Sequence, residues 1–204
     1  MKALRLIEGI KKRKYGPYPS FLPIDALRAI WNLEHRKGRG RLSSGLGIGE
    51  WSTRSILKFL KKEEVVDATP MGYKLTPKGF EFLEELRKYA VSMSAFHPTP
   101  LTLNKRSVGI LVRAKKPARV LDARDEAVRM GASGITLLFF KNGEFYFVDS
   151  GDEVQREYLP ALAEISSKFS FQEKDMLLLC FGDRDNLERA AWASFIKIYQ
   201  GRSE

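Results

Sequence analysis

The segment GIGEWSTRSILKFLKKEEVVDATPMGYKLTPKGFEFL, residues 47–83, decides the fold of the first half of the chain. Gly49 permits a tight bend, and apolar residues spaced three and four apart then predict a helix at about 51–62. The next residues alternate in polarity around Gly72, which is typical of a small hairpin. Pro77 suits the first turn of another helix. The segment therefore predicts a helix, a hairpin and a helix in succession.

The residues before this segment predict the rest of an N-terminal domain. Pro23 favours a helix start, and the apolar periodicity that follows predicts a helix over 24–37. The stretch LSSGLGI, residues 42–48, is interpreted as a short capped turn leading into the glycine bend. We therefore expect residues 1–91 to form a winged helix-turn-helix domain.

The second half has a different order of elements. Residues 92–104 contain two prolines and lack helical periodicity, which predicts a linker. The Asn142-Gly143 pair favours a type I′ turn between two strands. Residues 105–204 should form a domain of order β-α-β-β-α-β-α, as in ferredoxin-like or related α+β sheets. The expected elements are a strand at 107–113, a helix at 117–131, a hairpin at 134–149, a helix at 154–169, a strand at 175–181 and a helix at 185–199.

The charge of the chain is unevenly distributed. The formal net charge is +10, and residues 1–104 hold 19 Lys and Arg against 10 Asp and Glu, whereas residues 105–204 hold 16 against 15. A polyanionic partner accounts for such asymmetry, because each neutralised phosphate releases counterions. Nucleic acid is favoured over an anionic membrane surface, since no long basic amphipathic helix is present. The sequence shows neither a membrane-spanning run nor an apolar leader in its first 16 residues, which predicts a cytoplasmic protein.

Residues 20–90 resemble the winged-helix regulators, in particular through Thr53-Arg54-Ser55-Ile56-Leu57-Lys58-Phe59-Leu60 and YKLTPKGFEFL. The resemblance implies that the helix at about 51–62 enters the major groove of double-stranded DNA while the hairpin touches the backbone. Arg54 would then pair with guanine, and the lysines would follow the phosphates. The expected DNA-binding residues are Ser52, Thr53, Arg54, Ser55, Lys58, Lys61, Lys62, Arg39, Arg41, Tyr73 and Lys74. The alternative is an ordinary solvated charged face, and Trp51 is expected to pack beneath the turn.

The whole chain also resembles an archaeal family of winged-helix proteins that carry a C-terminal domain of unknown function. The residues that carry this resemblance are GLGIGEWSTRSILKFL, SGITLLFFKNGEFYFVD and LLLCFGDRDNLERAAWASF. The resemblance implies a transcription regulator and supplies no effector. The C-terminal domain would bind a small molecule, form a homodimer that sets the spacing of two reading helices, or do both. An RNA-binding or protein-binding accessory module is the second reading.

An enzyme is less favoured, because the sequence offers few groups for acid–base, nucleophilic or metal chemistry. His35 and His97 lack the spacing of metal ligands, and the acidic residues 149–153 lack the pattern of a calcium loop. Cys180 stands in an apolar run, which predicts a buried thiol. We therefore expect no metal, no cofactor and no catalytic residues, although archaeal riboflavin kinases that begin with a winged helix keep the enzyme alternative open.

Overall fold

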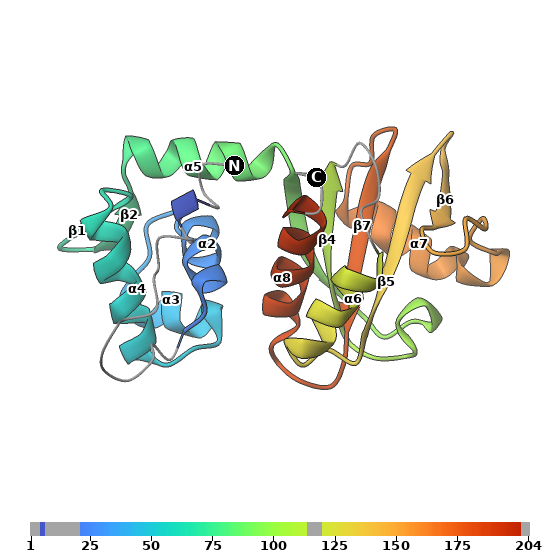
Figure 1. Ribbon diagram of the computed structural model, residues 1–204, viewed down its shortest axis with the longest axis horizontal. Helices are drawn as coiled ribbons and strands as arrows, with labels where there is room; N and C mark the ends of the chain where they lie inside the picture. The colour runs from blue at the N-terminus through green and yellow to red at the C-terminus, as the bar shows by residue number, and fades with distance from the viewer. Residues whose placement is uncertain (1–4, 7–20, 114–119, 201–204) are drawn as a thin grey trace. The chain divides into compact units, whose positions relative to one another are not determined.

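A computed structural model of the chain describes residues 5–6, 21–113 and 120–200. The chain divides into two compact units, Met1–Arg87 and Lys88–Glu204, each shown in Figure 1. Both units combine helices with antiparallel strands, so the predicted α+β class is confirmed. Two predictions fall partly outside the described residues. The prediction about an apolar leader concerns the first 16 residues, most of which are not described, and the predicted helix at 117–131 begins with three residues, 117–119, that are not described.

The N-terminal unit has the predicted order of a helix, a helix-turn-helix, a hairpin and a final helix. The interpretation of residues 42–48 as a mere turn is wrong, because Leu42 and Leu46 lie one helical turn apart and both are buried. Gly47 ends that helix in the left-handed conformation, with φ of 62°. The elements are α2 (Pro23–Asn32), α3 (Arg39–Leu46), α4 (Glu50–Lys62), β1 (Val66–Thr69), β2 (Gly72–Leu75) and α5 (Pro77–Arg87).

Helix α2 ends at Asn32, which is five residues earlier than predicted. The residues beyond it leave the helix, because Lys37 forms a β-bridge with Tyr73 of the hairpin. Each backbone nitrogen donates to the other residue's carbonyl oxygen, at 3.0 and 2.9 Å. Gly72 permits this approach: its φ is +120°, and a Cβ atom there would lie 2.6 Å from the Lys37 carbonyl oxygen. The hairpin is thus fixed to the segment between α2 and α3.

The start of α2 is held by a buried acidic residue. Asp25 accepts a hydrogen bond from the Leu22 backbone nitrogen at 2.8 Å and forms an ion pair with Arg28 at 2.9 Å. Both side chains are almost completely buried, so each satisfies the other's charge away from water. Around them the helices pack through fully buried aliphatic side chains: Leu27, Ile30, Leu33, Leu42, Ile56, Leu60, Leu83 and Leu86.

The C-terminal unit is a five-stranded antiparallel sheet with helices on both faces (Figure 1). The strand order is β3-β4-β7-β5-β6. Helices α6 and α8 pack together over one face, and α7 packs on the other. The elements are β3 (Ala90–Phe96), η1 (Pro100–Thr102), β4 (Ser107–Arg113), α6 (Val120–Arg129), β5 (Gly134–Lys141), β6 (Glu144–Phe147), η2 (Arg156–Tyr158), α7 (Leu159–Lys168), β7 (Asp175–Phe181) and α8 (Leu187–Gln200).

Strand β7 lies at the centre of the sheet and is buried along its whole length, as its apolar sequence predicts. Leu177 and Leu179 belong to a core cluster that also contains residues of α7. Cys180 points to the opposite face, where its sulfur lies 3.9 Å from the Ser194 hydroxyl of α8. Side chains of β7 therefore contribute to the core on both faces of the sheet.

The predicted order β-α-β-β-α-β-α is confirmed from β4 to α8, whereas the predicted linker is wrong. The expected linker at 92–104 is mostly structured: it contains all but the first two residues of β3, followed by η1, because Ala90–Phe96 pairs with β4 along the edge of the sheet. The sheet also departs from the ferredoxin-like arrangement. Strands β4 and β5 are parallel with one strand between them, as in a split β-α-β unit, but that strand is β7, and β6 lies at the edge. The predicted Asn142-Gly143 turn is confirmed, with φ of 53° and 86°.

Candidate nucleic-acid interface

Helix α4 presents two separate faces. Its buried face carries Thr53, Ile56, Leu57 and Leu60, which pack into the core of the N-terminal unit. The exposed residues recur three and four positions apart, so that they form one continuous line along the helix. We call this line the α4 stripe; it consists of Trp51, Arg54, Ser55, Lys58, Lys61 and Lys62.

Two of the contact residues predicted on α4 do not belong to the α4 stripe. Ser52 is 6% exposed and Thr53 is 0% exposed. The Thr53 hydroxyl donates to the carbonyl oxygen of Gly49, the N-cap of the helix, at 3.2 Å. The prediction of side-chain contacts with DNA does not hold for these two residues, because the helix turns both toward the protein interior.

Trp51 also differs from expectation. Its side chain is 78% exposed and does not pack beneath the turn, because it stands on the same side of the helix as Arg54. The Arg54 guanidinium carbon lies 5.6 Å from the centre of the indole ring, within the range of a cation–π contact. The Ser55 hydroxyl donates to the Trp51 carbonyl oxygen at 3.1 Å. The first turn of α4 thus exposes an aromatic ring beside a cation.

The two arginines of α3 for which phosphate contacts are predicted are both exposed. Arg39 is engaged, since its guanidinium donates to the Glu50 carboxylate at 3.1 Å. This ion pair joins the first turns of α3 and α4. Arg41 lies two residues further along α3, and its side chain is open to solvent.

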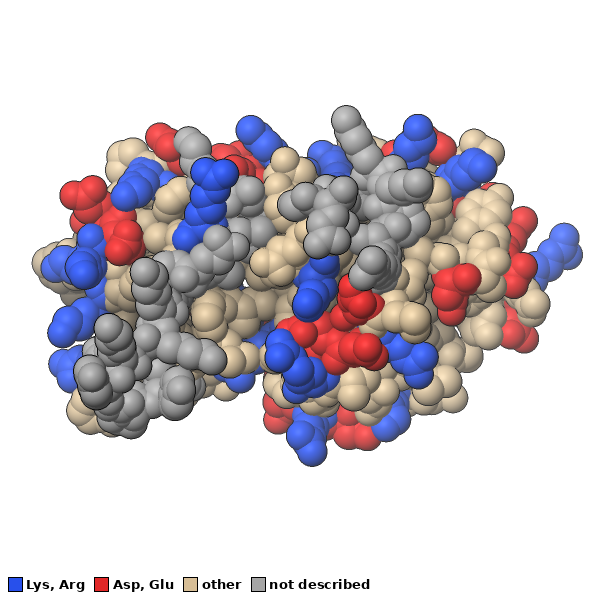
Figure 2. Space-filling model, viewed as in Figure 1, with Lys and Arg blue, Asp and Glu red and all other residues tan. Residues whose placement is uncertain are grey.

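Of the two contact residues predicted on the hairpin, one is exposed and the other is half-buried. Lys74 is exposed and stands opposite Asp67 in the register of the two strands. Tyr73 is half-buried, and its backbone is used in the bridge to Lys37. Met71, at the turn of the hairpin, is 75% exposed. Figure 2 shows lysine and arginine side chains on the side of the N-terminal unit that carries α4 and this hairpin.

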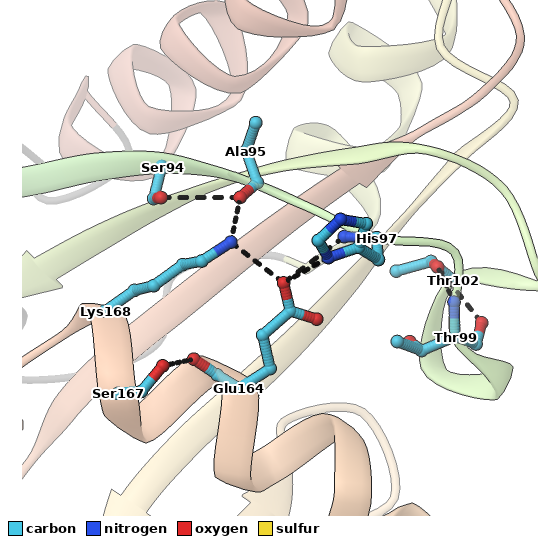
Figure 3. A network of polar contacts seen from close by, with 8 residues as sticks. All are labelled: Ser94, Ala95, His97, Thr99, Thr102, Glu164, Ser167 and Lys168. Carbon is cyan, nitrogen blue, oxygen red and sulfur yellow. Dashed lines mark hydrogen bonds and ion pairs between the residues drawn. The ribbon is translucent and has the colours of Figure 1, made fainter.

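A polar cluster in the C-terminal unit was missed by the sequence reasoning. Glu164 of α7 accepts hydrogen bonds from the Lys168 ammonium at 2.8 Å and from the His97 backbone nitrogen, and its Oε1 lies 3.0 Å from His97 Nδ1 (Figure 3). Lys168 also donates to the Ala95 carbonyl oxygen at 2.6 Å. Hydrogen bonding by Lys168 is the largest cause that lowers the pKa of Glu164. The cluster joins α7 to the end of β3, 67 residues away, and local sequence carries no signal for it.

A cavity of about 470 Å³ opens at the same end of the sheet. Its apolar wall includes Phe96, Val108 and Leu187. Arg106, Arg184, Asp185 and Glu188 also line it. Arg106 donates to the Asp183 carbonyl oxygen and to the Asp185 carboxylate. A small molecule with an apolar body has the size and chemistry to occupy it.

The described residues offer few side chains placed for nucleophilic or metal chemistry. Cys180 is fully buried, as predicted, and burial raises the pKa of its thiol to about 12. Within residues 5–6, 21–113 and 120–200 there is no group of three His, Cys, Asp or Glu side chains that could hold a metal ion. In the same residues no helix is long and apolar enough to cross a membrane.

Comparisons with known proteins concern mainly the fold. Residues 103–198 match a family described as a domain of unknown function, DUF4443. A hypothetical protein from Pyrococcus horikoshii OT3 has a similar structure, with a TM-score of 0.69 and 22% identity over 90% of this chain and 92% of that one. None of the curated proteins matches the chain.

Two more distant structures are also similar in part. One is an IclR transcriptional regulator from Alicyclobacillus acidocaldarius, with a TM-score of 0.29 and 12% identity over 90% of this chain and 98% of the other. The other is BusR from S. agalactiae in complex with its busAB promoter DNA, with a TM-score of 0.24 and 15% identity over 89% and 96%. Likenesses this distant do not bear on the function of the chain.

Proposed function

We propose that the chain is a DNA-binding transcription regulator that reads the major groove with α4. The observation that carries this proposal is the α4 stripe. Four of its side chains are cations, and they follow one another on the outer side of a helix that forms the second half of a helix-turn-helix. A helix of this kind fits the major groove, where cations near the bases and along the phosphates give specific and non-specific affinity respectively.

The flanking groups extend the interface. Arg41 and Lys74 are exposed on α3 and on the hairpin, at the positions where a winged helix meets the backbone of a duplex. Arg39 contributes less charge, because Glu50 partly neutralises it. Tyr73 contributes through the part of its side chain that remains accessible. Ser55 offers a hydroxyl within the stripe itself.

The C-terminal unit is the proposed regulatory part. It forms a homodimer, binds a small-molecule effector, or does both. The cavity lined by Phe96, Val108 and Leu187 supports the effector role, because it combines an apolar wall with charged side chains of both signs. A dimer would place two α4 helices on a palindromic site. Light scattering on the full-length protein measures the oligomeric state directly.

A selection from random duplex DNA tests the proposal. The full-length parent should enrich a defined motif, and an Arg54→Ala/Lys58→Ala variant should enrich it less strongly, with the preference at one base position relaxed. Lys141→Ala is the matched control, since Lys141 is an exposed cation of the C-terminal unit, far along the chain from the stripe. Failure of the parent to enrich any motif would contradict the proposed function.

Single-stranded RNA is the second candidate, and the exposed Trp51 favours it, because an indole ring can stack on a base. Base stacking along a strand needs several exposed rings. On α4, among its described side chains, Trp51 is the one aromatic residue with such exposure, since Phe59 is only partly exposed. Competition between a selected duplex and single-stranded RNA decides between the two ligands.

A further inference from the structure

We propose that Trp51 and Arg54 act together as the base-reading part of the α4 stripe, and that they select a thymine methyl group beside a guanine. The inference rests on the proposed function and deepens it, because it assigns a class of DNA sequence to this surface. Trp51 lies outside the set of contact residues that the sequence predicts, since a tryptophan at a helix start was expected to be packed.

The exposure of Trp51 is the first observation. Of the three tryptophans, Trp192 is fully buried and Trp31 is partly buried, whereas 78% of the Trp51 side chain is exposed. A large apolar ring in water gives no folding stability, and exposed rings of this kind mark contact surfaces. The indole is held on the helix that the charge pattern identifies as the reading element.

The contact between Trp51 and Arg54 is the second observation. The guanidinium carbon lies 5.6 Å from the ring centre, and no carboxylate among the described residues forms an ion pair with Arg54. Its hydrogen-bond donors therefore remain available for guanine O6 and N7. Base pairs succeed one another every 3.4 Å along a DNA strand. A ring and a guanidinium at this separation can reach neighbouring base pairs at the same time.

The chemistry of the surroundings favours a methyl group as the target of the indole. The ring cannot neutralise a phosphate, and the adjacent Glu50 carboxylate, whose charge Arg39 offsets only in part, disfavours a phosphate beside the ring. The cations that suit phosphates, Lys58, Lys61 and Lys62, begin two turns later. In the major groove the apolar group that a base presents is the C5 methyl of thymine. The stripe thus divides into a base-reading start and a phosphate-binding remainder.

The test varies the methyl group in the DNA and removes the indole ring from the protein. On the site selected by the full-length parent, each thymine is replaced in turn by uracil, which lacks the methyl group. At one position the parent should lose about four-fold in affinity, the factor for one buried methyl-sized group. Trp51→Ala should bind the thymine and uracil duplexes equally. Replacing the adjacent guanine by 7-deazaguanine should weaken the parent and leave Arg54→Ala unaffected.

A second duplex pair tests the same contact in the opposite direction. With cytosine or 5-methylcytosine at that position, the parent should prefer the methylated duplex by about four-fold, and Trp51→Ala should show no preference. Trp51→Phe retains a smaller ring and should retain part of the preference. Because the side chain is exposed, thermal unfolding of all three proteins should coincide.

Three results would overturn the inference. Equal thymine–uracil discrimination by the parent and Trp51→Ala would show that another residue reads the methyl group. A uniform loss by Trp51→Ala on every duplex, random sequence included, would assign the ring to sugar or phosphate. Failure of the parent to bind any duplex selectively would overturn the proposed function, and this inference with it.

Discussion

The Arg39 guanidinium lies 3.1 Å from the Glu50 carboxylate, and this ion pair ties the first turn of α3 to the first turn of α4. Glu50 places a negative charge at the N-terminal end of α4, the end that we propose contacts the bases. It also withdraws part of a positive charge from the proposed phosphate contacts. The balance of these effects can be measured.

Glu50→Gln should strengthen DNA binding several-fold and steepen its salt dependence. The substitution releases Arg39 to contact one more phosphate, which adds about 0.9 to the slope of log affinity against log salt concentration. The free energy of unfolding should fall by less than about 1 kcal/mol, because the pair is exposed. Titrations at several salt concentrations measure the slope. An unchanged slope would show that Arg39 does not reach the duplex.

Arg54→Ala and Lys58→Ala should weaken binding in different ways. Loss of Arg54 should cost about 1–3 kcal/mol on the selected site and relax the preference at one base position. Loss of Lys58 should weaken all sequences alike and reduce the salt slope by about 1. Binding of each variant to the selected site and to its single-base variants measures both effects. Equal affinity of Arg54→Ala and the parent for the selected site would remove Arg54 from base reading.

Gly72→Ala should destabilise the N-terminal unit more than Gly47→Ala does. A Cβ atom at Gly72 would meet the Lys37 carbonyl oxygen at 2.6 Å, and its φ of +120° is strained for alanine. Gly47 also has a positive φ, but a Cβ atom there meets nothing within 4 Å. We expect a loss of about 1–2 kcal/mol for Gly47→Ala and a larger loss for Gly72→Ala. Urea unfolding measures both, and equal losses would argue against the tight approach.

Glu164→Gln should reduce the stability of the C-terminal unit at neutral pH but not in acid. Hydrogen bonds from Lys168 lower the pKa of Glu164 below its ordinary value of 4.5 in the folded chain. The unfolded chain therefore takes up the proton first, and the stabilisation is present above pH 4.5 and lost as pH falls through the folded-state pKa.

The expected difference in unfolding free energy between the parent and Glu164→Gln is below about 1 kcal/mol at pH 6 and narrows toward pH 3. Glu153→Gln is the control, because Glu153 is an exposed carboxylate of the same unit. Thermal melts across this pH range measure the difference. A difference that is constant with pH would assign the effect to packing rather than to charge.

Periodic segments of the sequence predicted most of the elements. The α4 helix, the Asn142-Gly143 turn and the buried strand β7 carry their signals within a few residues, through apolar spacing or turn chemistry. Strand β3 was missed because prolines close behind Phe96 favoured a linker, and because its pairing with β4 is a tertiary contact. The position of β7 between β4 and β5 likewise depends on pairings between strands far apart in sequence.

The sequence likewise predicts only part of the candidate interface. The cations of α4 are exposed because they alternate with apolar residues at helical spacing. Ser52 and Thr53 are as polar as Ser55, but one residue of rotation along a helix is about 100°, which turns them inward. Trp51 was misplaced because an apolar residue is expected inside, and a residue type alone does not show which side of the helix it occupies.

The central claim is that α4 binds duplex DNA with sequence preference, and one titration tests it most directly. The full-length protein is titrated with its selected duplex, with a scrambled duplex and with single-stranded RNA of the same length, at two salt concentrations. We predict tightest binding to the selected duplex at both, and a salt slope of at least about 3 for the phosphates met by the lysines of α4. Binding to the selected duplex that is no tighter than to the scrambled duplex or the RNA would contradict the claim.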